Sequence, residues 1–309
     1  MSGATGSRNG TGVAAGERER VRETVGFAMY RAIAWLAKIL PSERGRRVFM
    51  RMGICAHAAL PGVRRVVAAN QARVLGRPID DPIVVGATKE AFRSYARYWF
   101  DAFDLIERDD TWVRERFTFN GFEHFEEAVE AGHGAVAVLP HFGNWDAAGR
   151  AMAAYGLPVV SVAERLRPAR LDRLFRAQRA ALGMEIVGLE DEGVGRRLGA
   201  ALASNRIVAL VADRDLTGGG IDVEMFGAPR KLPAGPALLA LTSGAPVLIA
   251  APHQTPEGWR CLVSGPVPRP ATGSRRADVA SLTREIAARL EAVIATDPTD
   301  WHMFQPAWA

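Results

Sequence analysis

The sequence predicts an α/β fold with a central, mostly parallel sheet and helices on both faces. From residue 122 onward, short apolar runs alternate with longer segments of helical periodicity, the order expected of βαβ units. The apolar runs are nearly continuous, which is typical of parallel strands buried on both faces. The 309 residues are 48% hydrophobic and contain no low-complexity linker. We therefore expect one domain over residues 17–309.

The expected elements follow from runs bounded by glycine, proline and polar residues. Strands are predicted at 134–140, 158–163, 185–189, 207–212, 246–251 and 259–264. Helices of the sheet region are predicted at 122–132, 145–155, 168–183, 192–204, 233–243 and 277–296.

The N-terminal third of the chain has a different pattern. Residues 1–16, rich in glycine, serine and threonine, predict a disordered tail. Helices are expected at 17–40, 42–60 and 61–76, separated by Pro41 and Pro61, and a longer one at 82–107. The long helix has an aromatic stripe, which is more often core than a groove for a lipid chain: Phe92, Tyr95, Tyr98, Trp99 and Phe103.

The positive charge is concentrated at the N-terminus. Residues 1–60 have a net charge of +6, against −1 for the rest of the chain. The first helix combines basic residues with an apolar stripe formed by Val25, Met29, Ala32, Leu36 and Ile39 and widened by Phe27, Ile33, Trp35 and Leu40. A basic helix with such a face favours an anionic membrane surface. The alternative is an ordinary helix whose apolar face joins the core.

Several classes of function lack their sequence signals. No apolar run is long enough to span a bilayer, and no secretory signal is present. There is no zinc-finger or RNP-like pattern, so we expect neither a bound metal nor a nucleic-acid partner. The absence of a G-x-S-x-G elbow disfavours an α/β-hydrolase. The two cysteines, Cys55 and Cys261, suggest a reducing compartment.

The candidate active site begins at His141, directly after the apolar run 134–140. Open α/β sheets bind ligands at the carboxyl ends of their strands. Histidine is the side chain best suited to proton transfer near neutral pH, and Asp146 follows five residues later. A histidine oriented by a carboxylate has the parts of a general base acting on an alcohol.

A second carboxylate competes with Asp146 for this role. Asp213 directly follows the apolar run 207–212. Because both runs are predicted to be parallel strands, Asp213 and His141 can face the same crevice. The sequence leaves open which aspartate is the partner of His141.

Several motifs together resemble the lysophospholipid acyltransferase superfamily, in particular the branch of the lipid A acyltransferases and the actinobacterial phosphatidylinositol mannoside acyltransferases. The first is His141-x4-Asp146 within Leu-Pro-His-Phe-Gly-Asn-Trp-Asp. The other matching runs are Ser94–Trp99, Val162–Leu166, Ala212–Thr217, Leu232–Ala237 and Asp300–Pro306. They span almost the whole chain.

The resemblance implies that a fatty acyl group, with palmitoyl the expected chain, moves from acyl-CoA to a mannose hydroxyl of phosphatidylinositol mannosides. His141 is then the base and Asp213 its partner, although the family has glutamate at that position. Asp146 supports the motif. Glu164, Arg165 and Arg179 correspond to the groove for the polar substrate, and the backbone N–H groups near Gly143 and Asn144 are expected to hold the oxyanion.

The same resemblance implies no cofactor besides acyl-CoA as donor substrate, and we expect a monomer at the cytoplasmic face of the cell membrane. Two alternatives remain. One is an acyltransferase for another glycolipid or a lysophospholipid. The other is a peripheral membrane protein that binds lipid without catalysis.

Overall fold

The computed structural model describes residues 10–216 and 218–308. The strands are β1 (Phe117–Asn120), β2 (Ala135–Leu139), β3 (Val159–Ala163), β4 (Glu185–Gly188), β5 (Ile207–Val211), β6 (Ile221–Met225), β7 (Ala228–Leu232), β8 (Val247–Gln254) and β9 (Trp259–Val263). The N-terminal helices are α1 (Gly10–Ile39), α2 (Ser42–Ala59), α3 (Pro61–Leu75) and α4 (Pro82–Asp104). The others are α5 (Asp110–Arg116), α6 (Glu123–Glu130), α7 (Trp145–Ala154), α8 (Ala169–Ala181), α9 (Val194–Ala203), α10 (Gly235–Ser243) and α11 (Arg275–Thr296).

Seven strands form the central sheet in the order β1-β9-β8-β2-β5-β3-β4. Every neighbouring pair is parallel except β8 with β9. The mostly parallel sheet predicted from the sequence is therefore confirmed. β6 and β7 form a separate antiparallel hairpin.

Helices cover both faces of the sheet, as predicted. Along β2, Val136 and Val138 pack with α9, α10 and α11. Ala135, Ala137 and Leu139 pack on the opposite face, with α5, α6 and α7. Because successive side chains of a strand point to opposite faces, a fully apolar strand can join two cores.

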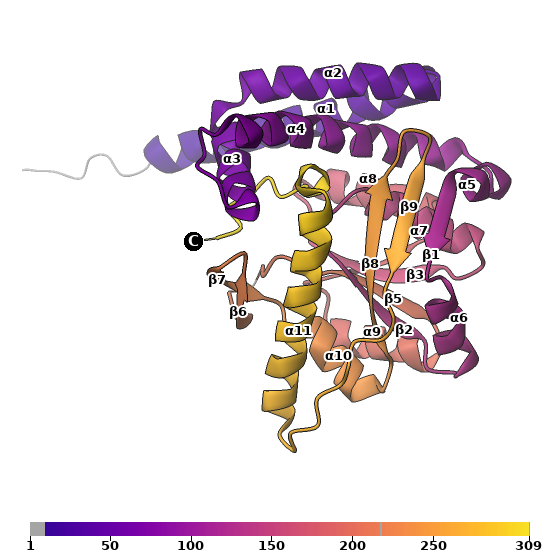
Figure 1. Cartoon of the computed structure of the whole chain (residues 1–309). Helices are drawn as coiled ribbons and strands as arrows, with labels where there is room; N and C mark the ends of the chain where they lie inside the picture. The colour runs from indigo at the N-terminus through magenta and orange to yellow at the C-terminus, as the bar shows by residue number, and fades with distance from the viewer. Residues whose placement is uncertain (1–9, 217, 309) are drawn as a thin grey trace, which may run out of the picture.

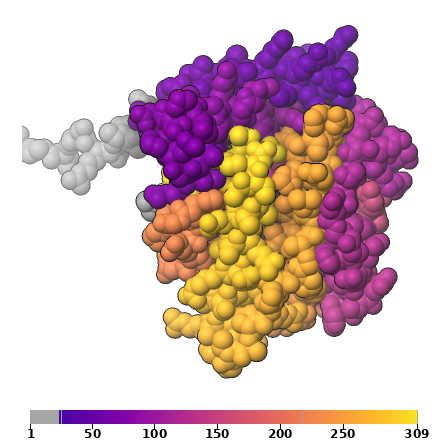
Figure 2. Space-filling model, in the orientation of Figure 1, coloured from indigo at the N-terminus to yellow at the C-terminus, as the bar shows by residue number. Residues whose placement is uncertain are grey.

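The N-terminal helices lie across one end of the sheet (Figure 1), and their indigo and purple residues form an outer edge of the molecule (Figure 2). Ala37 of α1 is buried in a cluster with Phe49, Phe100 and Phe103. α1 also exposes apolar side chains, namely Met29, Trp35 and Ile39. α1 therefore has a core-facing side and a second apolar side in solvent. No helix in the described ranges is long and apolar enough to cross a bilayer.

The structure differs from the sequence predictions in several elements. α1 begins at Gly10, so residues 10–16 of the predicted tail are helical, and residues 1–9 lie outside the described residues. The short strand β1, the helix α5 and the β6–β7 hairpin were not predicted. β1 and the hairpin have alternating burial with polar residues between the buried ones, so they lack the continuous apolar run used to recognise the other strands.

Candidate active site

The sheet register brings His141 and Asp213 together. β2 and β5 are parallel neighbours with Leu139 opposite Val211. The pairing continues one residue further, because the Ala212 N–H donates to the Leu139 carbonyl at 2.9 Å. His141 and Asp213 each lie two residues beyond the paired strand ends. Parallel strands therefore place a histidine and an aspartate 72 positions apart at one edge of the sheet.

His141 and Asp213 form a close pair. Nδ1 of His141 lies 2.6 Å from Oδ1 of Asp213. The other oxygen, Oδ2, accepts the His141 backbone N–H at 3.0 Å and the Trp301 indole N–H at 2.8 Å. Asp213 is fully buried, whereas the His141 side chain is 30% exposed. The structure thus assigns the carboxylate contact of His141 to Asp213.

The surroundings keep Asp213 ionised. Burial alone would raise the pKa of this carboxyl, but the charge of His141 and the hydrogen bonds from His141 and Trp301 outweigh burial and lower the pKa to about 2. An ionised Asp213 accepts a hydrogen bond from Nδ1–H of a neutral His141. Nε2, which has no hydrogen-bond partner among the described residues, then keeps a free lone pair.

The loop after His141 is fixed by its backbone. Gly143 has φ +56°, and a Cβ there would lie 1.6 Å from the Pro252 carbonyl oxygen. The Gly143 N–H donates to the Asp300 carbonyl at 2.8 Å, and the Asn144 N–H donates to the Pro252 carbonyl at 3.1 Å. The oxyanion hole expected from these two groups is therefore not formed, because both already have partners in the fold.

Asn144 has a structural position. Its side chain caps α7 by accepting the Ala147 N–H at 2.9 Å, and it is fully buried. This N-cap satisfies one of the free N–H groups at the start of the helix. Asn144, whose backbone N–H was expected to contact the substrate, is not among the residues that line the groove at His141.

Asp146 pairs with Arg179 instead of His141. Its Oδ1 accepts Nε–H of Arg179 at 2.9 Å, and its Oδ2 accepts the Tyr98 hydroxyl at 2.6 Å. Burial opposes the charge on Arg179, but Asp146 and Tyr98 raise its pKa above the usual value. Together with Tyr98, this ion pair links α7, α8 and α4.

A groove of about 590 Å³ opens at His141. Its walls come from α1, α4, α8 and the C-terminal segment, with Tyr30, Tyr95, Tyr98, Trp99, Trp145, Arg179 and His302 among the lining residues. The Trp145 ring packs edge-on against the His141 ring, with 5.5 Å between centroids. Part of the aromatic stripe of α4 thus lines the groove, while Phe92 and Phe103 are buried.

A second cavity of about 720 Å³ adjoins the groove. The two spaces share Val162, Glu164, Val211, Arg214 and Leu216. At this boundary Glu164 and Arg214 form an ion pair of 2.5 Å. The second cavity is mainly apolar, with Leu189, Val194, Leu198, Leu210 and Leu239 in its wall.

The other predicted substrate residue, Arg165, lies apart from both spaces. It is not among the residues that line either one. Its guanidinium lies 3.4 Å from Asp191, and both side chains are partly in solvent. The structure therefore places Glu164 and Arg179 at the groove, and Arg165 outside it.

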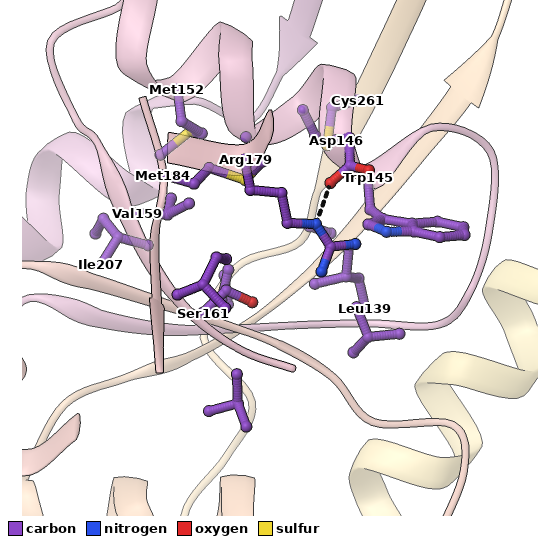
Figure 3. Close-up of a pocket in the computed structure, with 18 of the residues that line it drawn as sticks. Leu139, Trp145, Asp146, Met152, Val159, Ser161, Arg179, Met184, Ile207 and Cys261 are labelled. Atoms are coloured by element: carbon purple, nitrogen blue, oxygen red, sulfur yellow. Dashed lines mark hydrogen bonds and ion pairs between the residues drawn. The ribbon is translucent and has the colours of Figure 1, made fainter. Parts of the chain in front are cut away.

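A small apolar cavity of about 70 Å³ lies beside the Asp146–Arg179 pair (Figure 3). It is lined by residues of both the sheet and the surrounding helices, such as Leu139, Met152, Val159, Met184, Ile207 and Cys261. Burial raises the pKa of the Cys261 thiol to about 12. The thiol at this cavity therefore stays protonated near neutral pH and is a poor nucleophile. In the described part of the chain no group of three or more His, Cys, Asp or Glu residues could hold a metal ion.

The sequence reasoning missed three residues around the pair of His141 and Asp213. Trp301 donates to the carboxylate, Arg230 donates to the Asp213 carbonyl, and Arg214 pairs with Glu164 at the cavity boundary. Trp301 and Arg214 lie within runs that matched the family, so their position in a motif was the available signal. Arg230 lies on the unpredicted hairpin and had none.

The fold and the site define an acyltransferase. The family described as "Bacterial lipid A biosynthesis acyltransferase" matches residues 16–309, and the chain belongs to it. Among its relatives, the phosphatidylinositol mannoside acyltransferase of Mycolicibacterium smegmatis is 37% identical over 284 residues, covering 90% of each chain. The phosphatidylinositol mannoside acyltransferase of Mycobacterium tuberculosis is 36% identical over 293 residues, covering 92% of this chain and 86% of the relative. The resemblance inferred from the motifs is confirmed.

Proposed function

We propose that this acyltransferase moves a fatty acyl group, with palmitoyl the expected chain, from acyl-CoA to a mannose hydroxyl of phosphatidylinositol mannosides. The names of its relatives support the acceptor. The observation that supports the chemistry best is the 2.6 Å contact between His141 and a buried Asp213 at the wall of the groove.

In the proposed reaction, Nε2 of His141 takes the proton of the acceptor hydroxyl while its oxygen attacks the thioester carbonyl. Asp213 holds the imidazole in the Nδ1–H tautomer and stabilises the imidazolium that forms. The tetrahedral intermediate then expels the thiolate of CoA, which takes the proton from His141. The ester is formed in a single transfer, without an acyl-enzyme intermediate.

The two spaces suit the two substrates. Aromatic rings of the groove, including Tyr95, Trp99 and Trp145, offer flat apolar surfaces to the C–H face of a sugar ring. The second cavity is apolar and suits the acyl chain, because each buried methylene contributes about 0.8 kcal/mol. The shared boundary lies next to Ala212, which directly precedes Asp213.

The exposed apolar side of α1 supports a peripheral position on an anionic membrane. Met29, Trp35 and Ile39 project into solvent. Exposed basic residues lie on the same helix and on α2, including Arg31, Lys38, Arg44, Arg47 and Arg51. A helix of this kind is attracted by lipid charge and inserts its apolar side chains at the interface.

The decisive experiment is product analysis with matched histidine variants. Purified protein is incubated with palmitoyl-CoA and a mannosylated phosphatidylinositol, and the lipid products are identified by mass spectrometry. His141→Ala should reduce turnover by about 10²- to 10⁴-fold, the usual contribution of general base catalysis. His133→Ala, which changes an exposed histidine outside the groove, should leave turnover unchanged.

The outcome separates the alternatives. Acylation of a lysophospholipid or of another glycolipid in preference to the mannoside would show that phosphatidylinositol mannoside is not the preferred acceptor. Lipid binding without any turnover in the wild type would indicate a binding protein. Full activity in a folded His141→Ala variant would exclude His141 as the base.

A further inference from the structure

Asp213 receives hydrogen bonds from two separate segments of the chain. Oδ1 contacts Nδ1 of His141, and Oδ2 accepts the backbone N–H of the same residue. The only side chain that donates to Oδ2 in the described structure is Trp301, at 2.8 Å. With Asp213 fully buried, the orientation of its carboxylate depends on these donors.

Trp301 is itself held in place by the fold. It is buried, and its backbone pairs with Phe142 in an antiparallel bridge. Its indole packs edge-on against Trp308, with 5.9 Å between centroids. Its neighbours fix the same loop, because the Asp300 carbonyl accepts the Gly143 N–H and the His302 N–H donates to the His141 carbonyl at 2.7 Å.

The backbone of residues 300–302 therefore holds the loop 141–143, while the side chain of Trp301 donates to the carboxylate of Asp213. The indole N–H joins the two halves of the pair. A hydrogen bond from a buried N–H to a carboxylate favours the charged form and limits rotation of the carboxylate plane. Without it, Oδ2 would keep one donor from the backbone and the carboxylate could turn away from His141.

We propose that Trp301 is a positioning residue of the active site, whose indole N–H keeps Oδ1 of Asp213 aligned with Nδ1 of His141. This inference rests on the proposed function, in which His141 is the base. Trp301 does not touch the groove, since it is absent from the residues that line it. Its role is exerted through Asp213.

The other charged groups near the pair are few. Arg230 donates to the Asp213 carbonyl. Burial, together with the charge of His141, lowers the pKa of His302 to about 3, so His302 stays neutral. Asp300 hydrogen-bonds Ser94 and Gln254 instead of the pair. These groups are common to the wild type and to a Trp301 variant, so they do not account for a difference between the two.

The test removes the indole N–H of Trp301 and keeps an aromatic side chain at this position. In the full-length Trp301→Phe variant, kcat should fall about tenfold while the KM for the acceptor stays within about twofold of wild type. The acidic limb of the pH profile of kcat/KM should move to higher pH by about one unit. Without the indole N–H, the Asp213 carboxylate keeps more of its negative charge, and this charge favours the protonated form of the His141–Asp213 pair. Trp259→Phe is the matched control, because Trp259 is equally buried, its indole N–H has no partner in the described structure, and it does not line the groove.

A Trp301→Phe enzyme with wild-type kcat and an unchanged acidic limb would overturn the inference, and so would an equal shift in Trp259→Phe. If His141→Ala remains active, the proposed function fails first, and the two failures are thereby distinguished. Should Trp301→Phe not fold, NMR of the wild type provides the answer. The indole proton of Trp301 should be shifted downfield and protected from exchange relative to that of Trp308, and equal behaviour of the two would reject the contact.

Discussion

Asp146, the aspartate of the His-x4-Asp motif, forms an ion pair with Arg179 at 2.9 Å, and the carboxylate that contacts His141 is that of Asp213. The two carboxylates that competed for His141 in the sequence thus have different partners. One is part of a buried ion pair between helices, and the other contacts the candidate base. This division predicts different consequences for substitutions at the two positions.

Asp213→Asn should slow the chemical step by about 10²- to 10⁴-fold. The amide keeps the size of the side chain, but it loses the charge and can stabilise the wrong tautomer of His141. Single-turnover rates measure this step directly. Asp213→Glu keeps the charge and is expected to retain far more activity, so equal losses in both variants would argue against an electrostatic role.

Asp146→Asn should reduce the free energy of unfolding by about 3 kcal/mol, because it leaves the guanidinium of Arg179 buried without its counter-charge. Urea unfolding measures the change. The matched control is Asp222→Asn, which breaks the solvent-exposed pair with Lys231 and should cost less than about 1 kcal/mol. A stable but inactive Asp146→Asn would instead favour a direct role of Asp146 in the reaction.

The stability of the protein should depend on Asp300 between about pH 4 and 6. Burial raises the pKa of this carboxyl to about 6. Because the folded state binds its proton more tightly than the unfolded state, stability is lost as the pH rises through this window, by about 3 kcal/mol. Asp213 acts in the opposite direction at lower pH, since its folded pKa of about 2 makes stability fall as the pH drops below about 4.

The measurement for Asp300 is the unfolding free energy of wild type and Asp300→Asn from pH 4 to 8. The variant should lose the pH-dependent decrease that Asp300 causes. Parallel curves for the two proteins would show that Asp300 titrates at its ordinary pKa.

Gly195→Leu should shift the donor preference toward shorter acyl chains. Gly195 lines the second cavity, and a Cβ there meets no atom within 4 Å, so the larger side chain can be accommodated without a backbone clash. Competition between acyl-CoA donors of different length measures the shift. Gly199→Leu is the control on the same helix, because Gly199 also has free space but does not line the cavity.

The double variant Trp35→Ser, Ile39→Ser should bind anionic vesicles about tenfold more weakly than wild type, because two exposed apolar side chains no longer insert at the interface. Co-sedimentation at low and high salt separates this loss from the electrostatic attraction. Leu262→Ser, a change of an exposed leucine on β9, is the control and should leave binding unchanged. Equal binding of all three proteins would show that α1 does not insert.

The sequence predicted most of the sheet because β2, β5 and β8 are continuous apolar runs, and it placed His141 correctly at a strand end. It could not choose between Asp146 and Asp213, since that choice depends on which strands are neighbours in the sheet. The strand order and register are properties of tertiary packing and leave no local signal. Arg230 could not be predicted for the same reason. It lies 17 positions after Asp213, and only the folding of the β6–β7 hairpin brings its guanidinium to the Asp213 carbonyl.

Gly143 limits how this chain can evolve. Its left-handed backbone and the 1.6 Å approach that a Cβ would make to the Pro252 oxygen exclude every other amino acid unless the loop is rebuilt. Rebuilding the loop would also displace His141, which lies only two residues before Gly143. Substitutions of Gly143 are therefore not tolerated, and any descendant of this chain that keeps His141 in place also has to keep the glycine.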